Sequence, residues 1–331
     1  MSNKIYEDGF FNESHKEMYL KDLSEKTYVS YARVLKRARY VEEQLGKDLY
    51  NFNVSEIEQL LTFMSPGSYS VSGGNINVIR TYIRWAIQQD LRVDNINPLD
   101  SVISDEFINK FIDTTNKKLF TEEEINTIVG GLQSFQDAAI IQCLFEGIMG
   151  HEYSEILNIL KGDVDRDSTK LEVRNSPASG PMERRVAEVS PKLMNLLYSA
   201  ANETEYLKFN GMSNSKAQRI ELIENEYVFR SVKLRVVNYE RASNHLVLRR
   251  IKSIREWYGY PHLTATGIKN SGMLKMARDL YVVNKTLTRE DINKICKRFG
   301  ANAIATTRLT KDFLNVDTIR SLYPEVDEEQ A

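Results

Sequence analysis

Asparagine and arginine side chains recur on one side of a helix expected over residues 75–89. Apolar residues at three-and-four spacing mark the buried stripe of this segment, and Asn77, Arg80 and Arg84 fall on the opposite side. An arginine can donate two parallel hydrogen bonds to guanine, and an asparagine can pair with adenine. The residue types and their spacing therefore fit base recognition, although an ordinary solvated helix face would show the same pattern.

Basic residues are concentrated in two stretches of a nearly neutral chain. The 331 residues carry a formal net charge of −2. Residues 231–311 contain seventeen Lys and Arg against five Asp and Glu, and residues 26–47 contain six basic residues against Glu42 and Glu43. Segregated charge of this kind predicts a basic face, which suits a nucleic-acid partner. Solvated helix faces are the alternative explanation.

Cysteine and histidine give no indication of a metal centre. The four histidines are scattered, and neither they nor the two cysteines show the spacing of metal ligands. Cys143 and Cys296 stand in apolar helical contexts far apart in the sequence, so we expect reduced core residues and no disulfide. We therefore expect neither a metal nor a cofactor.

The composition is that of a folded soluble protein. Hydrophobic residues make up 42% of the chain and charged residues 27%. No apolar run approaches the ~18 residues that a membrane span needs. Residues 1–13 contain acidic residues and lack the apolar core of a secretory signal. We expect a cytoplasmic protein.

Helical periodicity dominates the first part of the chain. Apolar spacing predicts helices over residues 26–45 and 75–89, and a further helix that begins at Ser55. Residues 65–74, rich in Ser and Gly, predict a turn-rich connection. An Asn-Pro pair at 97–98 ends this helical unit.

A polar stretch marks the expected domain boundary. We expect a helical first domain over residues 1–112, a linker over 113–118 and a second domain over 119–331. Thr121, followed three residues later by Glu124, fits the capping box of a helix that opens the second domain.

The second domain is expected to add a small sheet to its helices. Alternation over residues 170–190 predicts strands with a hairpin near residues 176–181, and helical patterns lead up to Leu160 and continue from Pro191 to the end. The predicted fold class is mainly α with a small β-sheet in the second domain.

Several segments together resemble the tyrosine recombinase (phage integrase) family across nearly the whole chain. Residues 26–31 and 75–86 look like its core-binding domain, and residues 150–165 look like its Gly-x-Arg-x-x-Glu helix with the following Asp. Residues 263–271 fit the region of its His-x-x-Arg, and residues 299–307 fit its Leu-Gly-His-x-x-Ile-x-Thr-Thr segment. The resemblance implies a two-domain C-shaped clamp around duplex DNA.

The groups that the family chemistry requires are missing at the matched positions. Family members attack a DNA phosphate with a tyrosine hydroxyl, while two arginines and partner residues stabilise the transition state. No lysine stands in residues 176–182, where the family has one. The resemblance therefore implies that the chain is not an enzyme: it lacks the nucleophilic Tyr and the catalytic Arg and His. The degenerate positions are Glu152, Thr266, Lys269, Asn270, Ala301 and Thr310.

The clamp remains as an implied DNA-binding surface. Arg80, Arg84 and Asn77 are the expected base-edge contacts. Lys269 stands where the family's second arginine meets the phosphate, with Asn270 as a hydrogen-bonding neighbour. Further basic residues are expected along the DNA backbone: Arg33, Lys36, Arg37, Arg184, Arg185, Arg249, Arg250, Arg308 and Lys311.

The implied function is that of a sequence-specific transcriptional repressor of double-stranded DNA. The degenerate site also resembles lysis–lysogeny repressors of SPbeta-like Bacillus phages, which implies a role in maintaining phage lysogeny. The expected partners are operator DNA and a second protomer or an anti-repressor protein, without a membrane, in the nucleoid-associated cytoplasm of the bacterial host. Two alternatives stay open: a divergent active site-specific recombinase, and an interaction module that keeps only the fold.

Two packing arrangements are open for the last helical segment, residues 312–323. Its apolar residues can pack within their own chain or join two protomers: Phe313, Leu314, Ile319 and Leu322. Because a chain without strand exchange has no use for a tetramer, we expect a monomer or a weak dimer.

Overall fold

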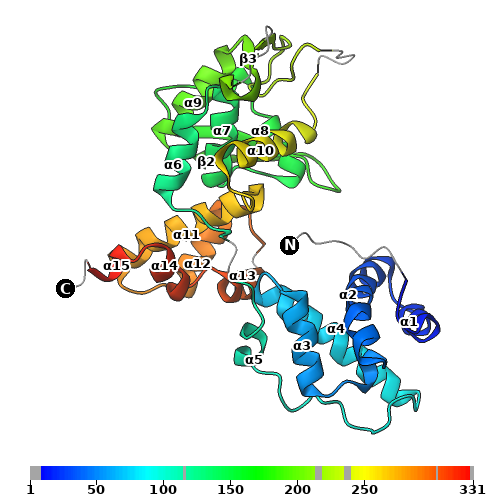
Figure 1. Ribbon diagram of the computed structural model, residues 1–331. Coiled ribbons are helices and arrows are strands. Elements are labelled where there is room, and N and C mark those ends of the chain that lie inside the picture. The colour runs from blue at the N-terminus through cyan, green and yellow to red at the C-terminus, as the bar shows by residue number, and fades with distance from the viewer. Residues whose placement is uncertain (1–8, 115–116, 213–217, 235–239, 303–304, 329–331) are drawn as a thin grey trace. The chain divides into compact units, whose positions relative to one another are not determined.

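The chain divides into two compact units, Met1–Asn116 and Lys117–Ala331, which we call unit 1 and unit 2 (Figure 1). The computed structural model describes residues 9–114, 117–212, 218–234, 240–302 and 305–328. Two residues of the predicted linker, 115–116, lie outside the described residues. Each unit has a hydrophobic core made of its own side chains.

Unit 1 is helical. Its core contains fully buried Leu35 of the second helix, Leu61 of the third and Ile83 of the fourth. A short 3-10 turn, Leu49–Asn51, links the second and third helices. The helices are α1 (Glu13–Leu20), α2 (Glu25–Leu45), α3 (Val54–Met64), α4 (Tyr69–Gln88) and α5 (Asp105–Asn109).

Two helix starts in unit 1 differ from the prediction. The cap of α3 is Asn53 and not Ser55, because the Asn53 side chain accepts from the Glu56 amide while the Glu56 carboxylate accepts from the Asn53 amide. Helix α4 begins at Tyr69, so most of the predicted connection at residues 65–74 is helical. Its glycine-rich start is held by tertiary contact, since the Ser72 hydroxyl donates to the Ile108 carbonyl at 2.7 Å.

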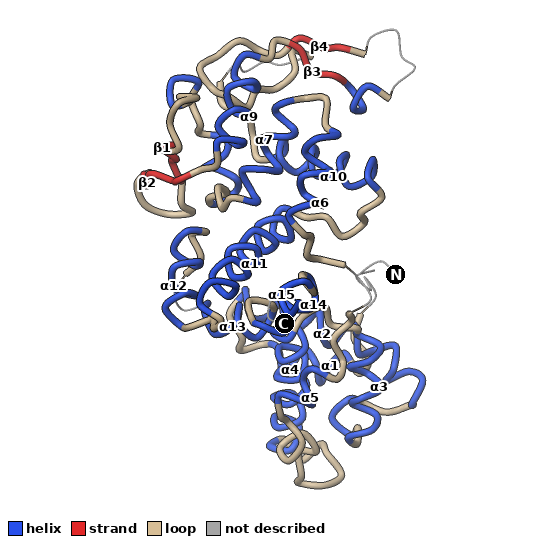
Figure 2. Tube along the Cα trace, turned by 90° about the vertical axis from the view of Figure 1, so that its left-hand side faces the viewer, coloured by secondary structure: helices blue, strands red, loops and turns tan. Residues whose placement is uncertain are grey.

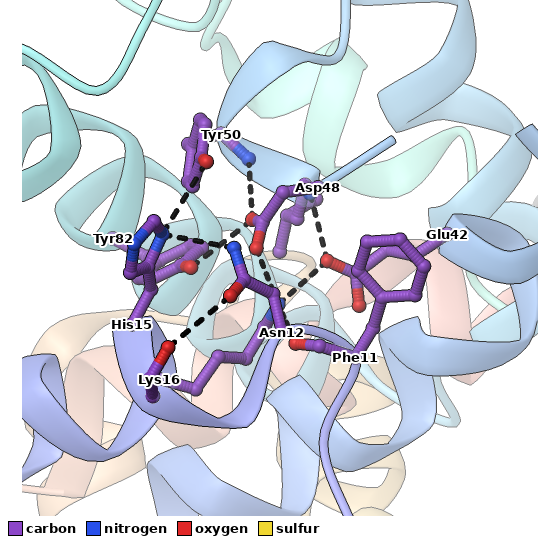
Figure 3. Close-up of polar contacts among 10 residues, drawn as sticks. Phe11, Asn12, His15, Lys16, Glu42, Asp48, Tyr50 and Tyr82 are labelled. Atoms are coloured by element: carbon purple, nitrogen blue, oxygen red, sulfur yellow. Dashed lines mark hydrogen bonds and ion pairs between the residues drawn. The ribbon is translucent and has the colours of Figure 1, made fainter. Parts of the chain in front are cut away.

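A buried ion cluster fastens α1 to the rest of unit 1 (Figure 3). The Lys16 side chain of α1 is fully buried, and its Nζ lies 2.6 Å from Glu42 Oε1 and 3.2 Å from Asp48 Oδ2. The same ammonium group donates to the Phe11 carbonyl and lies 5.1 Å from the centre of the Tyr82 ring. The Tyr82 hydroxyl in turn donates to Asp48, so the cluster joins α1, α2, the 3-10 turn and α4.

Unit 2 combines helices with two small antiparallel sheets, which are separate elements in Figure 2. Strands β1 (Lys170–Asn175) and β2 (Glu183–Glu188) form one sheet, and β3 (Glu205–Leu207) and β4 (Arg219–Glu221) the other. The helices are α6 (Glu122–Gly131), α7 (Phe135–Phe145), α8 (Ser154–Leu157), α9 (Pro191–Asn202), α10 (His245–Tyr258), α11 (Ala265–Asn284), α12 (Arg289–Arg298), α13 (Thr306–Asp312), α14 (Val316–Leu322) and α15 (Glu325–Glu328).

Most of the helices and strands predicted for unit 2 are present in the structure, in the predicted order. Thr121 caps α6 in a capping box with Glu124, and the predicted hairpin is β1–β2. The second sheet was not predicted, because its strands are three residues long and too short to alternate visibly. The predicted class, mainly α with a small sheet in the second domain, is confirmed.

Helix α11 crosses α7 at very short range in the centre of unit 2. A Cβ atom at Gly272 would lie 1.8 Å from the Phe145 carbonyl oxygen, so only glycine fits there. Cys143 of α7 and Cys296 of α12 are both buried free thiols, as predicted. The central helices therefore pack around small and apolar groups.

Two further searches of the described residues give negative findings. None of their helices has the length and hydropathy to cross a membrane. Nor do His, Cys, Asp and Glu gather anywhere among them in a group that could hold a metal ion.

Candidate functional site

A pocket of about 470 Å³ in unit 2 is lined by residues from three of the segments that carry the resemblance, 150–165, 263–271 and 299–307. Its walls come from the turn after α7, the β1–β2 hairpin, the start of α11 and the end of α12. The lining residues include Gly150, Glu155, Arg184, Arg185, Lys269 and Gly300. Segments more than a hundred residues apart in the sequence thus meet at one concave site.

The turn that carries the Gly-x-Arg-x-x-Glu match has an unusual backbone. Gly150 has φ 70°, and a Cβ there would approach the Glu155 amide nitrogen to 2.7 Å. Glu152 and Tyr153 both adopt left-handed conformations, with φ 49° and 65°. Glu152 is exposed and is absent from the pocket lining, whereas Glu155 is buried and faces it. The pocket is therefore closed on this side by Glu155.

Arg185 is half-buried and is held in place by Glu155. Its Nε donates to Oε1 of Glu155 at 2.7 Å and its Nη2 to Oε2 at 2.9 Å. The remaining donors reach the carbonyl oxygens of Gly147 at 3.0 Å and Arg298 at 3.4 Å. We expected Arg185 to contact the DNA backbone, but its guanidinium is already committed to internal acceptors. Its role in the structure is to join the hairpin to α7, α8 and α12.

Lys269 supplies a cation to the pocket. It lies on the second turn of α11 and makes no hydrogen bond or ion pair with any residue that the structure describes. Burial lowers the pKa of Lys269, and the Arg185 charge lowers it too, whereas Glu155 raises it. An ammonium group in this position gains from an anion that enters the pocket, because attraction between the two charges offsets the cost of its desolvation.

The other matched positions bring no group for strand cleavage to this pocket. The Thr310 hydroxyl donates to the Thr306 carbonyl within α13 at 3.0 Å. Thr266 is exposed, Asn270 and Ala301 are half-buried, and none of these four residues lines the pocket. Residues 303–304 of the matched segment lie outside the described residues.

The next tyrosine after Thr310 in the sequence, Tyr323, is also in the wrong environment for a nucleophile. Tyr323 is buried in the core formed by α11, α12 and α14, and burial raises the pKa of its hydroxyl. A buried phenol with a raised pKa is harder to ionise than an exposed one.

Neighbouring arginines in unit 2 differ in their exposure and in their ion-pair partners. Arg184 is exposed beside Arg185, with an ion pair to Glu172 at 3.2 Å. Arg249 is exposed on α10, whereas Arg250 has only 12% of its side chain exposed, lies 3.2 Å from Asp137 and stacks 3.3 Å from the Tyr206 ring centre. The charge of Arg250 is thus compensated by an internal carboxylate, and its contact with DNA stays a prediction. Arg308 and Lys311 are exposed on α13.

The predicted phosphate contacts in unit 1 lie on α2. Arg33 is exposed, and Lys36 lies 5.6 Å from the Phe10 ring centre. Arg37 is half-buried and donates to the Met64 carbonyl at the end of α3. Arg33 is thus the most accessible of the three, while Lys36 is half-buried like Arg37.

The base-reading candidates of unit 1 share one face of α4. Asn77 is exposed, with its amide 3.4 Å from the Tyr31 hydroxyl. Arg80 and Arg84 follow at one-turn spacing, and both pair with Asp100. We did not single out Asp100 from the sequence; it stands just after the Asn-Pro pair that ends this helical unit.

The helical unit 1, the mixed unit 2 and the meeting of three of the motif segments at one pocket define a chain of the tyrosine recombinase fold class. The model of a family domain described as "MrpR, C-terminal catalytic domain" matches residues 119–324, and "MrpR, N-terminal core-binding domain" matches residues 10–88. The chain belongs to the MrpR family.

Individual proteins resemble this chain along nearly its whole length. The "SPbeta prophage-derived uncharacterized protein YopR" of Bacillus subtilis (strain 168) is 27% identical over 320 residues, which covers 95% of this chain and 97% of that protein. A crystal structure of XerA recombinase shares 17% identity at a TM-score of 0.43, covering 94% of this chain and 96% of that one. A lambda integrase dimer bound to a core site shares 13% identity at a TM-score of 0.45, covering 90% and 93%.

Proposed function

We propose that the protein is a sequence-specific DNA-binding repressor that uses the recombinase fold without cleaving DNA. The observation that carries the proposal is the pocket of unit 2. It offers the Lys269 cation, both of its arginines are paired with carboxylates (Arg184 with Glu172 and Arg185 with Glu155), and no tyrosine stands among its lining residues. Such a site can hold a phosphate but has no group to attack it. The prophage origin of the relative YopR supports a role in maintaining phage lysogeny.

The charges around the pocket favour binding over cleavage. Stabilising the transition state of phosphoryl transfer needs positive groups aimed at the developing charge. Arg185, the cation closest to such a role, is neutralised by Glu155 in a two-point ion pair. The matched arginine position holds Glu152, whose carboxylate would repel a phosphate. Lys269 has no such partner among the described residues and acts as a point charge that contributes to affinity.

Unit 1 supplies the proposed sequence readout. Exposed Asn77 and Arg84 and half-buried Arg80 on α4 present the donors and acceptors that recognise adenine and guanine edges. Arg33 and Lys36 on α2 add cations for the phosphate backbone. Operator DNA in the host nucleoid would be the partner, and a second protomer or an anti-repressor would regulate its release.

One experiment separates this function from its alternatives. The full-length protein is mixed with a random duplex library, bound sequences are recovered, and the same reactions are run on a denaturing gel to detect covalent adducts. We expect a shared sequence motif without adducts. Covalent adducts would establish an active recombinase, and no binding to any duplex even at low salt would leave an interaction module.

The role of Lys269 is tested in the same assay. Lys269→Ala should weaken binding and reduce the slope of log affinity against log salt by about 0.9, because one phosphate contact is lost. Lys294→Ala is the matched control, since this exposed lysine pairs with Glu290 on α12 and does not line the pocket. Equal slopes for the two variants would show that no phosphate occupies the pocket.

A further inference from the structure

Asp100 holds both arginines of the α4 face through one oxygen atom. Its Oδ1 lies 2.6 Å from Arg80 Nε and 3.1 Å from Arg84 Nη2. The Asp100 side chain is 46% exposed, that of Arg80 36% and that of Arg84 50%. The hydrogen bond from Arg80 is the main reason that the pKa of Asp100 is lowered, so the carboxylate is ionised at neutral pH. A single anion thus bridges two cations one helical turn apart.

The carboxylate is fixed relative to α4 by its neighbours in the chain. The Asn97 side chain donates to the Arg80 carbonyl at 2.9 Å and accepts from the Leu99 amide at 3.1 Å. Leu99 itself is fully buried in the core of unit 1. Asp100 therefore stands on an anchored turn and can hold the arginine side chains in a defined direction.

Folding stability does not explain this arrangement. Exposed ion pairs contribute little to stability, because water screens them and the side chains lose freedom. The same exposure makes the pairs easy to exchange for another partner. An exposed but anchored carboxylate is better suited to orienting the two arginines than to stabilising the fold.

The geometry leaves both terminal nitrogens of Arg80, and one of the two in Arg84, without a hydrogen bond to any described residue. Arg80 donates to Asp100 through Nε, and neither of its terminal nitrogens makes a hydrogen bond or ion pair with the residues that the structure describes. Arg84 uses Nη2 alone. A guanidinium held at one edge by a carboxylate can still present its two terminal nitrogens to O6 and N7 of guanine.

We propose that Asp100 is a specificity-determining residue, which orients Arg80 and Arg84 toward guanine and keeps them from binding phosphates indiscriminately. The inference rests on the proposed function, since it assumes that α4 reads DNA. A backbone phosphate that approaches these arginines meets the negative charge of Asp100, whereas a guanine edge presents neutral acceptors. The carboxylate therefore penalises binding to random sequence more than binding to the correct one.

The test compares Asp100→Asn with Asp94→Asn in the full-length protein. Asp94 is an exposed carboxylate after the same helix, and it pairs with Arg92 instead of the α4 arginines. Both variants lose one negative charge, so the control measures the general effect of net charge. Each protein is titrated with a duplex selected by the wild type from a random library, and with a shuffled duplex of the same composition, over a range of salt concentrations.

We expect Asp100→Asn to reduce the affinity ratio between selected and shuffled duplex by roughly tenfold. Its binding to shuffled duplex should become stronger, with a salt dependence steeper by about 0.9, because a freed arginine now reaches a phosphate. Asp94→Asn should keep the ratio of the wild type. Equal ratios for both variants would overturn the inference alone, and a wild type that does not distinguish the duplexes would overturn the proposed function together with it.

Discussion

Adjacent arginines divide between the core and the surface at two places in unit 2. Arg185 faces inward on β2 and binds Glu155, while Arg184 beside it is exposed. On α10, Arg250 is neutralised by Asp137, while Arg249 is exposed. In both cases one member of the pair binds an internal carboxylate and the other is exposed.

The two glutamates of the turn after α7 should differ sharply in their contribution to stability. Glu155→Gln removes the charge that holds Arg185, and we expect the free energy of unfolding of unit 2 to fall by about 2 kcal/mol. Glu152→Gln should change it by less than about 0.5 kcal/mol, because Glu152 is exposed and makes no hydrogen bond or ion pair with the described residues.

The measurement can be confined to unit 2. The sequence contains two tryptophans, Trp85 in unit 1 and Trp257 in unit 2. In a Trp85→Phe background, urea unfolding followed by fluorescence reports on the surroundings of Trp257. A similar loss of stability in both variants would contradict the assigned role of the Glu155–Arg185 pair.

The candidate site was predicted only in part, because sequence patterns report on neighbouring residues and not on partners that are far apart in the chain. The match at residues 150–155 located the turn and Glu155, and the match at residues 263–271 located Lys269. The alternation of β2 would have indicated that Arg184 and Arg185 face opposite ways. The partners of Arg185 and Arg250 could not be read from the sequence, because Glu155 and Asp137 are about thirty and more than a hundred positions away.

At the scale of elements, α1 depends on a buried charge for its place in unit 1. It is eight residues long, and only Lys16 and Leu20 are buried. A helix of this length has little stability of its own in water. Its attachment therefore depends on the contacts of the Lys16 cluster and on the Tyr19 hydroxyl, which lies 2.8 Å from the Thr81 hydroxyl of α4.

This cluster predicts a pH dependence of stability. Burial raises the pKa of Glu42 from 4.5 to about 7; Lys16 opposes the shift and Asp48 adds to it. The folded state therefore binds a proton more tightly than the unfolded state does. The resulting stabilisation is complete below about pH 4.5 and is lost as the pH rises through 7, by about 3 kcal/mol in all.

Glu42→Gln should remove this component of the pH dependence. Urea unfolding of a Trp257→Phe background, in which Trp85 stacks on Tyr82 with ring centres 5.7 Å apart, reports on the cluster. The control is Glu43→Gln, since Glu43 is exposed and pairs with Arg39 on the helix surface. Parallel stability curves for Glu42→Gln and the control would contradict the assignment.

Elements with strong local signals were predictable, and those built by tertiary contact were not. The Thr121 capping box and the β1–β2 hairpin follow from residues close together in the sequence. The first turns of α4 contain Gly73 and Gly74 and are stabilised by contact with α5, thirty-six residues away. Sequence propensity alone cannot detect such a contact.

At the scale of the whole molecule, the C-terminal segment completes the core of its own unit. Phe313, Leu314, Ile319 and Tyr323 are buried against α11 and α12. Exposing these side chains to reach a neighbouring protomer would cost a large apolar area. We therefore expect a monomer or a weak dimer in solution, and sedimentation velocity of the free protein should give its mass. A stable tetramer would contradict this expectation.

The buried thiols bear on how this protein can be labelled. Cys143 and Cys296 are the two cysteines of the sequence, and both lie inside unit 2. Burial also raises the pKa of the Cys143 thiol well above its ordinary value, so it resists alkylation. A cysteine introduced at an exposed position would react with a maleimide dye in preference to either native sulfur. Fluorophores can thus be attached at chosen sites while the native cysteines stay in place.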